Sequence, residues 1–306
     1  MKKILVLLSS YNGEKHIREQ LDSILSQTWK NVEILVRDDG SSDNTPNILK
    51  EYEEQNKIHL ELGENVGFID SFFWLVKNCG EADYYAYSDQ DDVWFPEKLS
   101  MAIEKLEEAQ LTVTDLPVLY FSNYDYYDEQ LNFISHAFDV NRDKNPTFRN
   151  CLVDCMPLGF NSVFNKVARD TMAANIPKHS CGHDWWTYMV CQGMGKVIYD
   201  NRPTVKYRRT GSNVSPGGMD FIKHQIWRFK KFILSDYFSN VRIMLGEYRH
   251  LYNDKLSKEE QKLLSLFTRK KYNLIVALKK CFYPKKFRQT VADEILIRFF
   301  FLIGKL

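Results

Sequence analysis

Short apolar runs alternate with helical patterns along the first 120 residues of the chain. Each run is bounded by polar residues, which is typical of buried strands. The predicted strands are Ile4–Leu8, Glu33–Val36, Ile58–Leu62, Tyr84–Tyr87 and Val118–Phe121. Apolar residues recur at helical spacing between them, and the predicted helices span 17–25, 44–55, 68–77 and 96–106. This alternation predicts an α/β fold with a largely parallel sheet and helices on both faces.

Polar residues gather where the predicted strands end. In open parallel sheets, ligands bind outside the carboxyl ends of the strands. Polar or acidic segments directly follow the first four strands, at Ser9–Gly13, Arg37–Asp43, Glu64–Gly67 and Ser88–Asp92. The sequence therefore predicts a ligand site at this edge of the sheet.

The pattern between residues 120 and 216 is mixed. It predicts an aromatic turn or hairpin at Tyr124–Asp128, a short strand at Gly159–Phe164, a helix at His183–Gln192 and a strand at Lys196–Tyr199. The glycines and polar residues of Arg208–Gly218 predict a mobile loop. From Phe221 on, the chain is helical and basic, with one apolar face made of Ile222, Ile226, Phe229 and Ile233.

The run Asp89-Gln90-Asp91-Asp92 is the sharpest chemical feature of the sequence. Three carboxylates this close repel one another unless a positive charge lies among them. Asp89 and Asp91 point the same way if the segment is extended. Such oxygen ligands suit Mg²⁺ or Mn²⁺, which share them with substrate phosphates and neutralise the charge of a diphosphate leaving group. The alternative is an acidic turn that caps a helix opened by Pro96.

Asp38 and Asp39 follow the second predicted strand. A carboxylate there can accept a hydrogen bond from a nucleotide base or from ribose hydroxyls, and Tyr11 can stack on the base. The alternative is a strand-to-helix turn capped by Asp43 or Asn44. The chain has no Gly-x-Gly-x-x-Gly or Walker-type loop, which argues against a dinucleotide oxidoreductase and a P-loop NTPase.

Asp184 lies in the run Gly182-His183-Asp184-Trp185-Trp186 and is the candidate general base for removing a proton from a hydroxyl. The alternative for this aspartate is a helix cap. Trp185 and Trp186 are interpreted as an apolar wall or a surface on which a sugar stacks. His183 is the other acceptor-side residue, and its simpler interpretation is structural.

Arg208 and Arg209 precede the glycine-rich loop. They are candidates for contacting a diphosphate, and the alternative is a solvated basic pair. A loop that closes over the bound substrate would exclude water.

Charge divides the chain into two parts. Residues 1–220 carry 22 Lys or Arg against 33 Asp or Glu, whereas residues 221–306 carry 19 against 7. The acidic part is expected to bind a metal ion together with a diphosphate. The basic part is suited to an anionic membrane surface or an acidic partner. The overall charge of +1 predicts no nucleic-acid partner.

Four motifs in this order resemble family 2 glycosyltransferases with the GT-A fold. They are Ser9-Ser10-Tyr11-Asn12-Gly13, Asp38-Asp39-Gly40-Ser41-Ser42-Asp43, Asp89-Gln90-Asp91-Asp92-Val93-Trp94 and His183-Asp184-Trp185. The third and fourth resemble bacterial rhamnosyltransferases of surface polysaccharide synthesis most. The resemblance implies a Rossmann-like GT-A fold, with a mixed, mostly parallel sheet flanked by helices. The catalytic domain would span 1–215, with a nucleotide-sugar half (1–120) and an acceptor half (121–215), followed by a basic helical extension (216–306).

The resemblance also implies roles for individual residues. Asp91 would be the main ligand of Mn²⁺ or Mg²⁺, with Asp89 beside it, and Asp184 would be the catalytic base of a one-step inverting displacement. The residues implied in binding the nucleotide-sugar are Ser9, Tyr11, Asn12, Asp38, Asp39, Asp89, Arg208 and Arg209. Arg209-Thr210-Gly211 departs from the family pattern of Gln-His and a small polar residue, which leaves the donor open.

The expected function is transfer of a single sugar, L-rhamnose from dTDP-rhamnose or a hexose from a UDP-sugar, onto a lipid-linked cell-surface glycan. Two alternatives remain, an inactive nucleotide-sugar or glycan-binding protein and a metal-dependent nucleotidyltransferase. The chain shows no signal peptide, and its six cysteines are interpreted as reduced thiols, so a cytoplasmic location is expected. The interleaved aromatics Trp227, Phe229, Phe232, Phe299, Phe300 and Phe301 predict either peripheral membrane binding or packing onto the catalytic domain or a second subunit.

Overall fold

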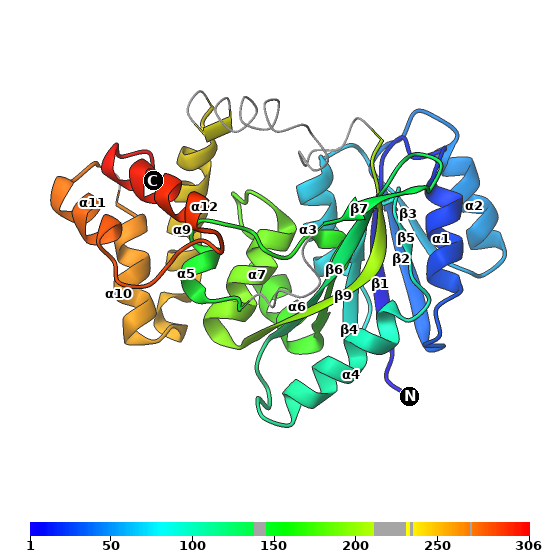
Figure 1. Ribbon diagram of the computed structural model, residues 1–306. Helices are drawn as coiled ribbons and strands as arrows, with labels where there is room; N and C mark the ends of the chain where they lie inside the picture. The colour runs from blue at the N-terminus through cyan, green and yellow to red at the C-terminus, as the bar shows by residue number, and fades with distance from the viewer. Residues whose placement is uncertain (138–144, 211–230, 233–234, 270) are drawn as a thin grey trace.

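The computed structural model describes residues 1–137, 145–210, 231–232, 235–269 and 271–306. A mixed sheet forms its centre, with helices on both sides and a further group of helices at one end (Figure 1). The strand order over the described residues is β3-β2-β1-β4-β8-β6-β9-β5, and β7 pairs with β6 outside this path.

The first half of the sheet is parallel, as predicted. Its strands are β1 (Ile4–Ser10), β2 (Val32–Asp38), β3 (His59–Leu62) and β4 (Tyr84–Ser88). The connecting helices are α1 (Ile17–Leu25), α2 (Thr45–Glu54) and α3 (Phe68–Asn78). β1 shows why this half forms, because Leu5 and Leu7 enter one hydrophobic cluster while Val6 and Leu8 enter the cluster on the opposite face. A strand buried on both faces needs apolar residues at every position.

The second half contains antiparallel pairs, which agrees with the mixed sheet that the family resemblance implied, although the apolar pattern alone did not locate them. β8 (Ser162–Asn165) lies antiparallel between β4 and β6 (Val118–Tyr127). β6 runs parallel to β9 (Lys196–Arg208), and β5 (Val93–Trp94) pairs antiparallel with the end of β9. The aromatic segment forms a hairpin between β6 and β7 (Phe133–His136), which confirms that prediction.

The predicted strand at Lys196–Tyr199 was too short. β9 continues to Arg208 through Asp200 and Arg202. These two side chains form an ion pair with each other, so neither charge lacks a partner within the strand. Register shifts against β6 between Ser122 and Asn123 absorb the irregular stretch. Because the polar run interrupts the apolar pattern, the sequence marked only the first third of the strand.

The remaining helices cover the sheet and extend it at one end. Those before residue 200 are α4 (Lys98–Gln110), α5 (Phe148–Cys151), the 3₁₀ turn η1 (Gly159–Asn161), α6 (Lys166–Ala174) and α7 (His183–Met194). Those after it are α9 (Tyr237–Tyr252), the 3₁₀ turn η3 (Asn253–Lys255), α10 (Lys258–Phe267), α11 (Leu274–Cys281) and α12 (Val291–Leu302). The glycine-rich loop and the helical face of Ile222, Ile226, Phe229 and Ile233 lie outside the described residues.

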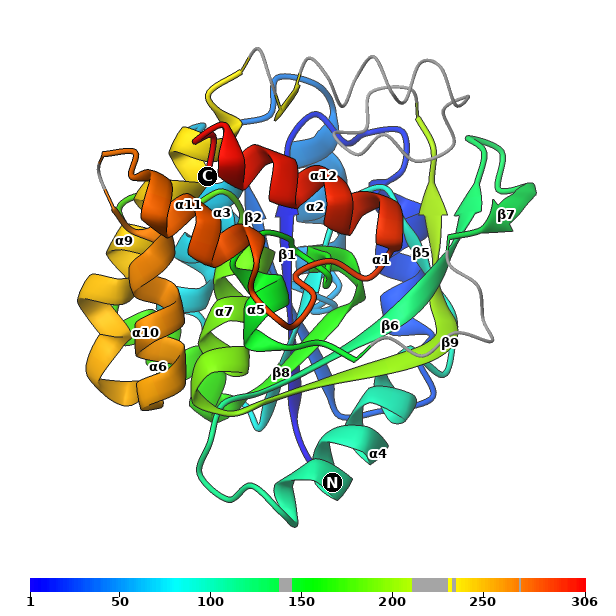
Figure 2. The same cartoon turned by 60° about the vertical axis from the view of Figure 1, so that its left-hand side comes forward.

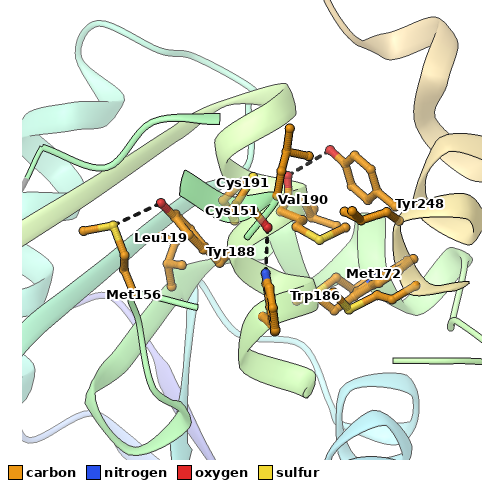
Figure 3. Packing of buried hydrophobic residues seen from close by; sticks show 14 of the residues in the cluster. Leu119, Cys151, Met156, Met172, Trp186, Tyr188, Val190, Cys191 and Tyr248 are labelled. Atoms are coloured by element: carbon orange, nitrogen blue, oxygen red, sulfur yellow. Dashed lines mark hydrogen bonds between the residues drawn. The ribbon is translucent and has the colours of Figure 1, made fainter. Parts of the chain in front are cut away.

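The C-terminal helices share one hydrophobic core with the sheet. Tyr248 of α9 donates a hydrogen bond to the backbone oxygen of Met189 at 2.8 Å, and its ring packs edge-on against Trp186 (Figure 3). Phe232, Phe300 and Phe301 lie in or against this same cluster. Their packing onto the rest of the chain matches the alternative in which the tail aromatics serve the core.

Candidate active site

The loop after β4 brings the carboxylates of Asp89, Asp91 and Asp92 together out of bulk water. Burial, followed by the charges of Asp91 and Asp184, raises the pKa of Asp89 to about 7. Burial also raises the pKa of Asp91. The influence of Asp184 on Asp89 places the candidate base and the acidic loop at the same site, although they lie 95 residues apart in sequence.

Asp92 has a structural role beneath this loop. It is fully buried, and one carboxylate oxygen accepts the backbone N–H of Arg208 at 3.2 Å. Lys98, also fully buried, donates to the backbone oxygen of Phe160 at 3.1 Å and lies 4.7 Å from the ring centre of Trp94. Desolvation lowers the pKa of Lys98 to about 7, against the opposing effect of Asp92.

The alternative in which the acidic run caps the following helix is wrong. That helix, α4, begins at Lys98 with Glu97 at its N-cap, and no side chain caps it. The acidic residues lie before the short strand β5 instead. The carboxylates are therefore free of the capping task that could have explained their clustering.

Arg208 holds the acidic loop in place. Its Nε donates to the backbone oxygen of Asp91 at 2.9 Å, its Nη1 donates to the backbone oxygen of Glu129 at 2.6 Å, and its Nη2 forms an ion pair with Glu19. It is almost completely buried, so the interpretation as a solvated residue is wrong for Arg208.

Arg209 is partly exposed and lies beside two tyrosines. Its backbone N–H donates to the backbone oxygen of Tyr127 at 2.8 Å. Its guanidinium lies 5.9 Å from the ring centres of both Tyr126 and Tyr207. It is thus the more accessible of the two arginines expected at a diphosphate.

Asp38 organises the turn after β2. One of its oxygens accepts hydrogen bonds from the hydroxyls of Ser10 at 3.0 Å and Ser41 at 2.6 Å, and the other accepts the backbone N–H of Ser41 at 2.9 Å. Gly40 takes a positive φ of 76° in this turn, which glycine adopts without strain. The cap alternative is supported in part: Asn44 makes no side-chain capping bond to α2, but Asp43 accepts the backbone N–H of Thr45, the first residue of α2, at 3.0 Å.

Asp39 joins β2 to the start of α3. It accepts the backbone N–H groups of Val66 at 3.0 Å and Gly67 at 2.9 Å, and it forms an ion pair with Arg37. Asp39 is buried, as is Asp38. Both carboxylates therefore shape the edge of the site in addition to any contact with a ligand.

The loop after β1 is tied to the acidic loop by Gln90, which the sequence analysis did not single out. The Gln90 amide accepts the backbone N–H of Tyr11 at 2.8 Å and donates to the backbone oxygen of Tyr11 at 2.9 Å. A Cβ at Gly13 would lie 2.3 Å from the Gln90 side-chain oxygen, so only glycine allows this approach. The sequence did carry a signal for this role, because Gln90 is the single uncharged residue in a run with three aspartates.

Ser9, Tyr11 and Asn12 are brought to the same edge. The Ser9 hydroxyl lies 2.7 Å from the hydroxyl of Ser71. The side-chain oxygen of Asn12 accepts the backbone N–H of Ser42 at 2.8 Å. Tyr11 is 47% exposed, so its side chain is open to stacking.

Asp184 lies in the first turn of α7 and accepts the backbone N–H of Trp185 at 2.7 Å. Burial raises its pKa from the usual 3.8 to about 6, although hydrogen bonds from backbone groups oppose the shift. A carboxyl with this pKa is mostly ionised at neutral pH and is a stronger base than an exposed aspartate. These are the properties that a general base needs.

The tryptophans beside Asp184 belong to the hydrophobic core and offer no stacking surface. Trp185 donates from its indole nitrogen to the backbone oxygen of Cys151 at 2.7 Å, and both rings are buried. A sugar therefore has no open ring face there, which corrects the stacking expectation. His183 is buried as well and stacks on Phe72 at 3.8 Å, and burial lowers its pKa to about 3, so it is neutral and structural.

The residues present fit a divalent cation that is completed by substrate. In the part of the chain that the structure describes, no three His, Cys, Asp or Glu side chains are arranged to hold a metal alone. Asp89 and Asp91 nevertheless lie side by side in a desolvated loop, where their mutual repulsion favours a positive charge. Mg²⁺ is commonly held by one or two carboxylates together with substrate phosphates and water.

An open groove of about 590 Å³ adjoins the site. The start of α3 forms one wall through Val66 and Phe68, and the loop before α7 forms another through Lys178 and Ser180. α9 supplies the third through residues that include Ile243. The groove thus lies between the segment bonded to Asp39 and the segment that leads into Asp184.

The mixed sheet with acidic loops at the carboxyl ends of β2 and β4 defines a GT-A glycosyltransferase. The chain belongs to glycosyl transferase family 2, because the sequence model of that family matches residues 5–172. This confirms the family, the fold class and the enzyme class expected from the sequence.

Two curated relatives illustrate the range of the family. The dTDP-rhamnosyl transferase RfbG of Shigella flexneri is 27% identical over 231 residues, which cover 68% of this chain and 75% of the relative. An uncharacterized glycosyltransferase of Rickettsia typhi is 25% identical over 213 residues, which cover 67% of this chain and 63% of the relative, slightly less than two thirds of its length.

Solved structures share the fold. TarS of S. aureus in complex with UDP-GlcNAc matches with a TM-score of 0.60 and 14% identity, over 99% of this chain and 79% of that chain. TarS in complex with UDP matches with a TM-score of 0.56 and 15% identity, over 92% of this chain and 72% of that chain. Identities this low establish a common fold and nothing about shared substrates.

Proposed function

We propose that this glycosyltransferase moves a single sugar, with inversion, from a nucleoside-diphosphate sugar to a hydroxyl of a lipid-linked glycan. The observation that carries the proposal is the convergence of Asp89 and Asp91 with Asp184 at one edge of the sheet. These groups match the two needs of the reaction, charge neutralisation at a departing diphosphate and removal of a proton from the acceptor.

The nucleotide would bind at the ends of β1 and β2. Tyr11 offers an exposed ring for the base, while Asp38 and Asp39 lie in turns that their own hydrogen bonds already fix. Such preorganisation lowers the cost of binding. The name of the Shigella relative favours dTDP-rhamnose, and UDP-hexoses are the second candidate.

Asp91 and Asp89 would hold Mn²⁺ or Mg²⁺ together with the donor diphosphate. The bound cation would neutralise charge on the leaving group. Arg208 fixes the backbone of Asp91, so its contribution is to hold this carboxylate in position. Arg209, which is partly exposed, is the better candidate for direct contact with the diphosphate.

Asp184 would act on the acceptor. As the acceptor oxygen attacks the anomeric carbon on the face opposite the diphosphate, its proton passes to the Asp184 carboxylate. The bond to the diphosphate oxygen breaks in the same step, which inverts the configuration. The acceptor would reach this position along the groove between α3 and α9, whose lining combines apolar residues with Lys178, Lys231 and Asp70.

We also propose that the enzyme works at the cytoplasmic face of the cell membrane, where a lipid-linked acceptor is presented. Among the described residues, no helix is both long enough and apolar enough to cross a membrane. The attachment that we propose is peripheral, and a homodimer is the second candidate role for the C-terminal helices.

The test is release of nucleoside diphosphate from a panel of dTDP- and UDP-sugars, with Mn²⁺, with Mg²⁺ and with EDTA. We expect one donor to be hydrolysed slowly in a metal-dependent manner, and Asp91→Asn to abolish the release. Asp115→Asn, at an exposed position with a φ of 57°, is the matched control because asparagine tolerates that backbone conformation.

The outcomes separate the candidate functions. Metal-dependent binding of a nucleotide-sugar by calorimetry, without turnover on any acceptor, would support an inactive binding protein. Formation of a nucleotide-sugar from a nucleoside triphosphate and a sugar phosphate would support a nucleotidyltransferase. Neither binding nor turnover of any nucleotide-sugar would overturn the proposal.

A further inference from the structure

α12 has apolar residues on two sides, and only one side serves the core. Ile297, Phe300 and Phe301 are buried in the large hydrophobic cluster. Val291, Ile295 and Phe299 recur every fourth residue on another face, and they are 63%, 66% and 51% exposed. A helix that served only this fold would carry polar residues on the solvent side.

α11 repeats this pattern beside α12. Leu274 and Ile275 are 58% and 65% exposed, and Phe282, directly after the helix, is 76% exposed. The two helices lie side by side at the surface (Figure 2), and the hydroxyl of Tyr272 donates to the backbone oxygen of Leu302 at 2.9 Å. The α11–α12 face is defined here as Leu274, Ile275, Phe282, Val291, Ile295 and Phe299.

Basic residues accompany this face. Residues 271–306 contain eight Lys or Arg and two acidic residues. Lys271, Lys279, Lys285 and Lys286 are all exposed, and Lys285 lies 3.9 Å from the exposed carboxylate of Glu259 on α10. Both acids are engaged within the chain, because Asp293 pairs with Thr290 at the start of α12 and Glu294 forms an ion pair with Arg298. The surroundings of the face therefore present positive charge.

We propose that the α11–α12 face docks on an anionic phospholipid surface, with its six apolar side chains at the level of the acyl chains and the lysines at the headgroups. Apolar residues beside exposed lysines are the composition that binds such interfaces. A second copy of the chain docking through the same face would bring two sets of lysines together, and like charges oppose that arrangement.

This surface differs from the one that a count of aromatic residues suggests. Phe232, Phe300 and Phe301 pack in or against the core, so they are not available to lipid. Of the tail aromatics expected at a membrane, Phe299 is exposed among the described residues, and the aliphatic residues of the α11–α12 face supply most of the remaining surface. The inference does not depend on the donor or on the chemistry of the site.

The test is flotation of the full chain with vesicles of phosphatidylglycerol and phosphatidylethanolamine. Ile295→Ser with Phe299→Ser is expected to lower the vesicle partition coefficient by on the order of a hundredfold, because two large apolar side chains no longer enter the interface. The matched control is Ile134→Ser with Phe133→Ser, which changes the same residue types at 50% and 52% exposure on β7. The control is expected to float like the unmodified chain.

A second pair of variants tests the charge. Lys285→Ala with Lys286→Ala is expected to weaken partitioning by on the order of tenfold. Lys50→Ala with Lys77→Ala, exposed on α2 and α3, should leave it unchanged. Vesicles of phosphatidylcholine alone should bind the unmodified chain far more weakly than the anionic vesicles.

Three results would overturn the proposal. They are no flotation of the unmodified chain with anionic vesicles, equal loss in the serine pair and its control, and a dimer by light scattering that the Ile295→Ser/Phe299→Ser pair abolishes while flotation is unaffected. Nucleotide-sugar hydrolysis measured without vesicles reports on the proposed enzymatic function separately.

Discussion

Single residues at the candidate site owe their properties to removal from water. The same desolvation raises the pKa of Asp184 to about 6 and lowers the pKa of Lys98 to about 7, because burial disfavours whichever form is charged. The two groups serve different ends. Asp184 is partly accessible and suited to exchange a proton, whereas Lys98 is sealed beneath the acidic loop.

The first prediction concerns the pH dependence of Asp184. The proposed base must be ionised, and its pKa lies above the ordinary aspartate value, so kcat/KM for transfer should decline as the pH falls below about 6. Asp184→Asn should lower kcat by on the order of 10²–10⁴-fold while donor binding is retained. Calorimetry with donor and steady-state rates across pH test this. A rate independent of pH between 5 and 7, or an active Asp184→Asn variant, would remove Asp184 from this role.

The second prediction concerns the stability provided by Lys98. Lys98→Met removes the donor to the Phe160 backbone oxygen and the positive charge near Asp92, so unfolding should become easier by about 1–3 kcal/mol. Urea unfolding measures this cost. Burial raises the pKa of Asp92 well above its usual value, so an ionised Asp92 is costly without Lys98. The double variant Lys98→Met/Asp92→Asn should recover part of the loss, because no ionisable group is then left at this position. No recovery in the double variant would mean that the two groups are not coupled.

At the scale of elements, α9 holds the segment that leads into the candidate base. The carboxylate of Glu247 accepts the backbone N–H groups of Lys178 and His179, the second at 2.9 Å. Met244, one turn earlier on α9, accepts the N–H of Cys181 at 3.3 Å. A helix outside the region matched by the family model therefore orders the approach to α7.

The third prediction follows from this contact. Glu247→Ala should speed amide exchange in residues 176–182 and lower kcat by roughly tenfold, because small misplacements of catalytic groups are costly. Glu247→Gln keeps an acceptor oxygen, so its exchange rate and its kcat should lie between those of the unmodified chain and those of Glu247→Ala. Hydrogen exchange and steady-state rates measure this, with Glu259→Gln on α10 as a control. Unchanged exchange in this segment would show that the contact does not order it.

The sequence predicted the elements with regular patterns well. β1, β2, β4 and the helices between them follow uninterrupted apolar spacing, and the acidic residues that lead to the site fall directly after those strands. The later half was harder to predict, because β9 contains a polar stretch and β8 pairs antiparallel with its neighbours. Register between distant strands depends on tertiary packing, which a single sequence does not display.

The roles of individual site residues were predicted less well than their location. Arg208 and the pair Trp185 and Trp186 were expected to meet ligand, yet they are buried and bind other parts of the chain. Polar or amphipathic residue types permit either role, and burial decides between them. Gln90 shows the converse, since an uncharged residue in an acidic run joins two loops.

At the scale of the whole molecule, the sheet and the C-terminal helices should unfold together. Tyr248 of α9 is fully buried against Trp186 of α7. Tyr248→Ala should therefore destabilise the chain by about 3–5 kcal/mol. The fourth prediction is that the two probes, tryptophan fluorescence and far-ultraviolet circular dichroism, report one common unfolding midpoint in the unmodified chain. They should also share one midpoint in the variant, at a lower denaturant concentration. Two separated transitions would show that the C-terminal helices form an independent unit.

The position of α9 limits how this enzyme can be rebuilt. The helix fills the core against α7, forms a wall of the groove and orders the loop before Asp184. A chimera that joins residues 1–210 to the tail of another family member would replace all three sets of contacts at once. We therefore expect that exchanging the tail alone does not transfer the acceptor preference proposed for the groove. Grafts are expected to succeed only where the α7-facing side of the incoming helix is kept.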